Sequence, residues 1–147
     1  MYYSRFMKRV VLDTNVLTAA LRSRNGASFA VLQMVARRAL VPLVTTALFL
    51  EYESVLKRPE QRAAHGFSTR DIDAVLAEFA ALAEGVEVHF RWRPQLSDPK
   101  DEFVLEAAVN ANADALVTHN LKDFDALRDR FALRVLRPVQ LLQEIGS

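Results

Sequence analysis

Short apolar runs alternate with longer amphipathic stretches along this chain of 147 residues. The runs at residues 8–13, 40–44 and 113–118 contain mainly valine, leucine and alanine and have the length of strands. Between them, apolar residues recur at the three- and four-residue spacing of helices. Parallel strands need long crossover connections, so this alternation is typical of a parallel sheet covered by helices on both faces. We therefore expect a three-layer α/β/α fold with a central parallel sheet of four to five strands.

The remaining segments complete this expected order. Residues 86–90 and 133–136 are expected to be strands, and residues 101–112 and a final segment from Pro138 are expected to be helices. The polar stretch at residues 59–67 is typical of a loop. Side chains that favour helix N-caps stand before three further helical patterns: Ser28, Thr45 or Thr46, and Ser68 with Asp71 in a capping box.

Composition narrows the chemistry that the chain can carry. Hydrophobic residues make up 51% of the chain, enough for a buried core, and there is no cysteine. Disulfides, thiolate metal sites and thiol nucleophiles are therefore excluded. No apolar run approaches the length of a membrane span, and no secretory signal pattern is present at the start. We expect a cytoplasmic protein with a flexible tail at residues 1–7 and a single domain at residues 8–147.

Polar side chains follow two of the expected strands directly. Asp13 ends the first strand and Asn15 follows it, whereas Thr118 ends the strand at residues 113–118 and is followed by Asn120 and Asp123. In a parallel sheet the carboxyl ends of neighbouring strands share one edge, and ligands bind in the crevice beyond it. These two clusters are therefore expected to meet.

Two further acids, Glu51 and Asp101, lie at or near helix starts that would face the same edge. Clustered carboxylates repel one another, and a hard divalent cation such as Mg²⁺ or Mn²⁺ relieves that repulsion through oxygen ligands. Such a site is suited to phosphodiester hydrolysis, because the ion neutralises the phosphate and activates water. The sequence therefore predicts a metal-dependent nuclease site.

The overall charge is compatible with a nucleic-acid substrate. The formal net charge is +1, and 15 of the 19 basic residues are arginine, which suits bidentate phosphate contacts. Setting the four acids aside in a metal site leaves the rest of the chain more positive. A cationic rim around such a pocket would hold a polyphosphate backbone.

Four landmarks in fitting order carry a family resemblance. They are VVLDTNVL at residues 10–17, EYESVLKRP at 51–59, DPKDE at 98–102, and ADALVT at 113–118 running into Asp123-Phe124. Together they resemble the PIN domain, the fold of the VapC toxin ribonucleases of bacterial toxin–antitoxin pairs, from residue 8 to about residue 145.

The resemblance implies an endoribonuclease that uses Mg²⁺ or Mn²⁺ and acts as a toxin. It implies a homodimer silenced by an antitoxin protein that covers the active groove. The catalytic and metal-binding acids that it implies are Asp13, Glu51, Asp101 and Asp123. The supporting residues that it implies are Asn15, Thr118, Asn120 and Asp98.

The fourth acid departs from the commonest family pattern. Many members have Thr-Gly-Asp where this chain has Thr118-His119-Asn120, so an amide replaces a ligand acid. Other VapC-like members have Thr-x-Asn with Asp-Phe three residues on, which Asn120 and Asp123-Phe124 reproduce. Asp123 is therefore taken as the fourth acid, with Asn120 as a neutral oxygen ligand or water positioner.

Two of the acids have rivals nearby. Glu51 and Glu53 both flank the apolar stripe of their helix, so periodicity does not choose between them. Asp98 and Asp101 can both cap the helix that follows. The spacing of the family motifs favours Glu51 and Asp101.

Two other functions compete with the nuclease. The amide at Asn120 favours a degenerate PIN domain that binds RNA or a protein partner without cutting. A signalling receiver domain would need an acidic pair after the first strand and a lysine after the last. Here Asp13 stands alone and the last strand offers Arg134 and Arg137, which disfavours a receiver.

Overall fold

The computed structural model describes residues 8–89, 99–125 and 133–146, with backbone only for residues 99 and 100. The expected tail at residues 1–7 and the candidate Asp98 lie outside these ranges. None of the helices in the described ranges combines the length and hydropathy that a membrane span needs.

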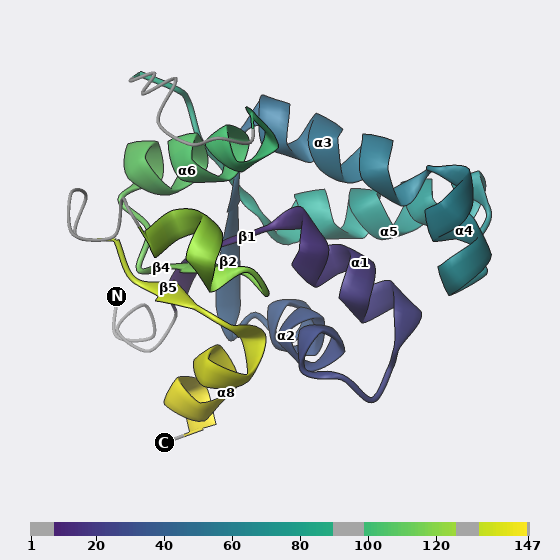
Figure 1. The fold of residues 1–147 in the computed structure, drawn as a ribbon, viewed down its shortest axis with the longest axis horizontal. Coiled ribbons are helices and arrows are strands. Elements are labelled where there is room, and N and C mark those ends of the chain that lie inside the picture. The colour runs from purple at the N-terminus through teal and green to yellow at the C-terminus, as the bar shows by residue number, and fades with distance from the viewer. Residues whose placement is uncertain (1–7, 90–98, 126–132, 147) are drawn as a thin grey trace.

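Five parallel strands form one sheet in the order β3-β2-β1-β4-β5 (Figure 1). The strands are β1 (Lys8–Leu12), β2 (Leu40–Val44), β3 (Glu84–Gly85), β4 (Ala115–Val117) and β5 (Val135–Leu136). The central strand β1 is buried on both faces, with Val10, Val11 and Leu12 fully covered. This burial explains why β1 is a continuous apolar run.

Helices cover both faces of this sheet, so the predicted three-layer α/β/α fold is confirmed. They are α1 (Thr14–Arg22), α2 (Ala27–Ala36), α3 (Thr46–Leu56), α4 (Pro59–His65), α5 (Thr69–Leu82), α6 (Pro99–Ala111) and α8 (Pro138–Gly146), with a 3₁₀ turn η2 (Leu121–Phe124). Helix α6 packs on β1, β2 and β4, whereas α2 packs on β2 and α8 from the opposite side (Figure 1). Helix α1 packs against α2, α3 and α4.

The pairing of β1 with β4 places the two polar clusters side by side. Leu12 lies opposite Val117 in the register, and the backbone N–H of Asp13 donates to the Val117 carbonyl at 2.9 Å. Asp13 and Thr118 therefore leave the sheet next to each other, at its carboxyl edge. The register between β1 and β4 therefore brings together two segments that are far apart in the sequence.

A buried tyrosine fixes α3 against the end of β1. The Tyr52 hydroxyl donates to the backbone carbonyl of Leu12, and its ring meets Phe79 edge to face with centroids 5.7 Å apart. Burial raises the pKa of Tyr52 well above its usual value, and the negative charge of Asp13 adds to this effect. Tyr52 therefore stays a neutral donor, and Glu51 beside it is carried to the same edge of the sheet.

Residues 59–67, expected to be a loop, instead contain helix α4. Its sequence has Pro59 in the first turn and Gly66 just after the end, in the left-handed region at φ 78°. Both are positions that these residues favour at helix ends. No residue of α4 is buried, so the helix lacks the apolar periodicity on which the expectation rested.

Two other details differ from expectation. Gly26 precedes α2, so Ser28 is not its cap but lies inside the helix, where its hydroxyl contacts a histidine ring. The strand expected at residues 86–90 lies earlier, at Glu84–Gly85, and residues 86–89 form no strand. The expected Thr45 cap and the Ser68–Asp71 capping box are confirmed.

We predict that Tyr52→Phe lowers the free energy of unfolding by about 1–3 kcal/mol, because it removes the buried hydroxyl donor of the Leu12 carbonyl. Urea denaturation measures this change. Ser54→Ala is the matched control, since it removes a hydroxyl from the exposed side of the same helix, where changes stay within about 0.5 kcal/mol. Equal stability of the two variants would contradict the anchoring role of Tyr52.

Candidate functional site

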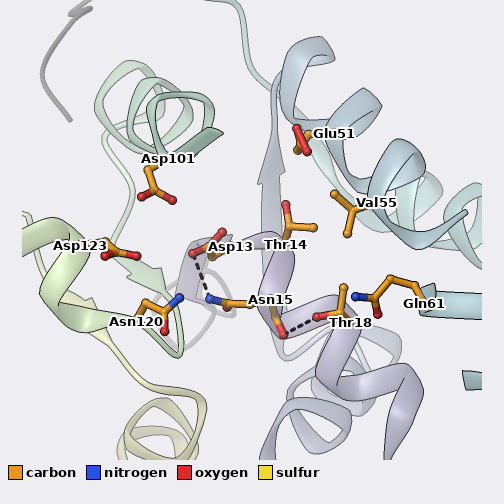
Figure 2. Close-up of a pocket in the computed structure, with 10 residues that line it drawn as sticks. All are labelled: Asp13, Thr14, Asn15, Thr18, Glu51, Val55, Gln61, Asp101, Asn120 and Asp123. Atoms are coloured by element: carbon orange, nitrogen blue, oxygen red, sulfur yellow. Dashed lines mark hydrogen bonds between the residues drawn. The ribbon is translucent and has the colours of Figure 1, made fainter. Parts of the chain in front are cut away.

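A pocket of about 220 Å³ opens at the carboxyl edge of β1 and β4 (Figure 2). A single water needs only about 15 Å³ of such space, so a hydrated cation and a phosphate fit together. The residues that line it are Asp13, Thr14, Asn15, Thr18, Glu51, Val55, Gln61, Asp101, Asn120 and Asp123. The four expected acids and two of the expected supporting residues therefore line one cavity.

Asp13 is turned into this pocket by two hydrogen bonds. It stands at the N-cap position of α1, yet its side chain makes no capping bond. Instead Oδ2 accepts from the Thr118 hydroxyl at 2.7 Å and from Nδ2 of Asn15 at 3.3 Å. These donors stabilise a negative charge on a side chain that is only 7% exposed. The geometry thus departs from a purely structural helix cap.

Thr118 is the centre of the hydrogen bonds around Asp13. It is fully buried, donates to Asp13, and accepts from the backbone N–H of Asn120 at 3.0 Å and from Nδ2 of Asn15 at 3.3 Å. The side-chain oxygen of Asn15 accepts in turn from the backbone N–H of His119 at 3.2 Å. This network ties the start of α1 to the loop after β4 and fixes the shape of the pocket floor.

Asp101 and Asp123 come from α6 and η2 and turn their carboxylates toward Asp13 (Figure 2). Asp101 is half-buried and Asp123 is exposed. Glu51 comes from α3 and lies on the other side of the pocket, beyond Thr14 (Figure 2). The acids therefore divide into a group of three aspartates and one separate glutamate.

Glu51 has an unusual environment for a carboxylate. Its Oε1 is buried and has no hydrogen-bond partner among the residues that the structure describes. Its rival Glu53 forms an ion pair with Lys57 at 3.0 Å and does not line the pocket. A buried carboxylate oxygen without a donor is costly, and a metal ion or a water held by one would relieve that cost.

The donor set fits a hard divalent cation. As the side chains stand, no three acids or histidines within the described ranges lie close enough to hold one ion. Mg²⁺, however, keeps several waters and is usually held by only one or two carboxylates. Asp13 with Asp101 or Asp123 supplies such a pair, and all the available ligands are oxygens. Asp98 lies outside the described residues, so its rivalry with Asp101 stays open.

His119 lies next to the pocket and contacts helix α2. Its Nε2 lies 2.7 Å from the Ser28 hydroxyl on α2, and the residue does not line the pocket. Burial lowers the pKa of His119, and the nearby positive charge of Arg137 lowers it further. The ring is therefore a neutral hydrogen-bonding group that joins the loop after β4 to α2.

The structure adds lining residues that the sequence did not indicate. Gln61 comes from α4, the helix expected to be a loop, and Nη2 of Arg22 donates to its side-chain oxygen at 3.0 Å. The sequence feature that could have predicted this helix is the pair Pro59 and Gly66, which are favoured at the start and just after the end of helices. Helix α6 also carries two buried acids, Glu102 and Glu106, which do not line the pocket.

A family model described as PIN domain matches residues 9–122, well over half of the chain. The chain is also similar to one in the crystal structure of VapBC2 from Rickettsia felis, which is bound to a DNA fragment from its promoter. Identity is 17% at a TM-score of 0.55, over 88% of this chain and 98% of that one, a likeness of fold alone. No curated protein sequence matches.

We predict that Mn²⁺ or Mg²⁺ raises the melting temperature by several degrees. A ligand at about 100 times its Kd adds roughly 2.7 kcal/mol to the folded state, and a chain of this size gains about 2–4 °C per kcal/mol. Asp101→Asn is expected to lose at least half of this shift, because it removes one of the two carboxylates that would hold the ion. Differential scanning fluorimetry measures it.

Glu53→Gln is the control, since it removes a carboxylate that pairs with Lys57 and does not line the pocket. It is expected to keep the full shift. An equal loss in both variants, or no shift in the wild-type protein, would count against a metal site in this pocket.

Proposed function

The chain belongs to the PIN domain family, and from this premise we propose that it is an endoribonuclease that uses Mg²⁺ or Mn²⁺ to hydrolyse RNA phosphodiesters. PIN domains are nucleases, which supports a hydrolase. The observation that carries the proposal is that Asp13, Glu51, Asp101 and Asp123, from four separate segments, line one pocket at the carboxyl edge of the sheet.

Asp13 and Asp101 are the proposed principal ligands, with Asp123 as the third carboxylate. Asp13 suits this role because Thr118 and Asn15 hold one of its oxygens and fix the rotamer. Asp101 and Asp123 face it across the pocket (Figure 2). A bound Mg²⁺ or Mn²⁺ would neutralise the phosphate and lower the pKa of the attacking water.

Glu51 is proposed to orient the attacking water rather than to lie among the aspartates. It stands on the other side of the pocket, and its buried Oε1 is an acceptor without a donor. Because Glu51 lines the pocket, a water hydrogen-bonded to its carboxylate would lie between Glu51 and the aspartates, where a scissile phosphate would fit. Asn120, which lines the pocket beside Asp123, is proposed as a neutral ligand or water positioner where the commonest family pattern has an acid.

The biological setting is proposed from the family likeness. VapC-like members are toxins of toxin–antitoxin pairs, and the sequence landmarks of this chain are similar to theirs. We propose the same setting here: a cytoplasmic homodimer whose pocket is covered by an antitoxin protein.

A second candidate is a degenerate PIN domain that binds RNA or a protein partner without cutting it. Two observations favour it: Asn120 replaces an acid of the common pattern, and no three acids of the described residues are grouped closely enough to hold one ion. The two functions share the pocket but differ in whether the bound strand is cleaved.

We predict that the wild-type protein cleaves structured RNA, and that EDTA stops cleavage while added Mg²⁺ or Mn²⁺ restores it. Asp13→Asn and Asp101→Asn are expected to lower the rate by roughly a hundredfold or more, the scale of losing one preorganised electrostatic group. Gel analysis of labelled RNA over time measures both effects.

Asp114→Asn is the control substitution. Asp114 is exposed at the opposite end of β4, where it accepts from the backbone N–H of Arg9, so its amide variant should cleave normally. Cleavage that persists in both Asp13→Asn and Asp101→Asn would refute the assignment of the site. RNA binding without cleavage by the wild-type protein would favour the degenerate domain.

A further inference from the structure

Three lining residues that are not acids, Thr18 on α1, Val55 on α3 and Gln61 on α4, form a wall that lies away from Asp101 and Asp123 (Figure 2). Glu51, one helical turn before Val55 on α3, borders this wall. A strand whose scissile phosphate lies among the aspartates can extend along this wall, which lines the same pocket. The hydrogen-bonding groups of the wall therefore decide what kind of chain can lie there.

Gln61 is the residue of this wall whose side chain can donate hydrogen bonds to a ligand. The Thr18 hydroxyl already donates to the backbone carbonyl of Asn15 at 3.1 Å, and Val55 is apolar. The side-chain nitrogen of Gln61 has no partner within the described part of the chain, and the residue is half-buried. Its two N–H groups are thus available to an acceptor in the pocket.

The orientation of the Gln61 amide is fixed by Arg22. A guanidinium can only donate, so the atom that faces Nη2 of Arg22 at 3.0 Å must be the amide oxygen. The amide nitrogen then points to the other side, toward the pocket beside Thr18 (Figure 2). Arg22 itself is exposed and keeps further N–H donors and a permanent positive charge next to the wall.

The Gln61 amide beside the Arg22 guanidinium is better suited to bind a phosphate than a base or a protein side chain. Non-bridging phosphate oxygens only accept hydrogen bonds and carry negative charge, which matches amide donors beside a guanidinium. The same group would be repelled by the opposite side of the pocket, where three aspartates lie, unless a cation is bound there. The wall therefore favours a phosphate one position along the strand from the one that is cut.

We propose that Gln61, held in place by Arg22, is a positioning residue that binds a backbone phosphate of the RNA next to the scissile phosphate. The inference rests on the proposed nuclease function and adds a second phosphate site to it. Because the contact is to the backbone, it fixes the path and register of the strand and carries no base specificity.

The test uses a short, fluorescein-labelled, single-stranded RNA pool of random sequence. Its affinity is measured by fluorescence anisotropy in Ca²⁺, and its cleavage is measured separately in Mg²⁺. Gln61→Leu keeps the size of the side chain but removes both N–H donors. It is expected to raise Kd and KM by about tenfold, the effect of one hydrogen bond to a charged group, with kcat little changed.

Gln143→Leu is the matched control, because Gln143 is exposed on α8 and does not line the pocket. It should bind and cleave like the wild-type protein. Melting temperatures of all variants show whether each is folded.

Arg22→Met provides a second, independent readout. Removing a cation that neutralises one phosphate lowers the slope of log Kd against log salt by about 0.7 for a single strand. Gln61→Leu removes no charge and should leave that slope unchanged while weakening binding. A structural defect alone would not separate the two variants in this way.

The outcomes separate this inference from the proposed function. If the wild-type protein cleaves RNA but Gln61→Leu keeps wild-type Kd and KM, the phosphate contact is wrong and the nuclease stands. If nothing is cleaved but Gln61→Leu weakens RNA binding relative to Gln143→Leu, the nuclease is wrong and the contact stands. An unchanged salt slope in Arg22→Met would overturn the role of Arg22.

Discussion

The site depends on one hydrogen bond, from the buried Thr118 hydroxyl to Oδ2 of Asp13 at 2.7 Å. It exists because β1 and β4 pair in a register that sets Leu12 opposite Val117. A different register would separate the two residues and break the backbone hydrogen bond from Asp13 to the Val117 carbonyl. The packing of the core and the geometry of the pocket are therefore specified together, and the hydroxyl keeps the carboxylate away from the capping position that it would otherwise take.

Placing several acids around one cavity works against stability. Asp13 is almost buried, Glu51 has a buried oxygen without a donor among the described residues, and Asp101 and Asp123 face Asp13 across the pocket. The start of α1 offsets part of this cost, because its unpaired N–H groups and macrodipole favour negative charge near Asp13. Proteins commonly accept such destabilising arrangements at functional sites and make up for them by favourable packing elsewhere in the fold.

Much of this architecture could be predicted from sequence because the core strands are apolar on both faces. The runs at β1, β2 and β4 are too short for helices and end in polar residues, which located both the sheet and its carboxyl edge. Helix α4 could not be predicted from apolar spacing, because it buries no residue, and Gln61 was missed with it. Periodicity was equally unable to separate Glu51 from Glu53, since both flank the stripe. Only the direction of each side chain, toward the pocket or toward Lys57, distinguishes them.

The central claim is that one divalent cation binds among these carboxylates. A crystal structure determined with Mn²⁺ tests it most directly, through anomalous density from the metal. The account predicts a peak in the pocket at about 2.1 Å from carboxylate oxygens of Asp13 and Asp101, with waters completing the shell and one of them within reach of Glu51. A structure with Mn²⁺ bound elsewhere, and Asp13 still held by Thr118 and Asn15 without a metal contact, would contradict it.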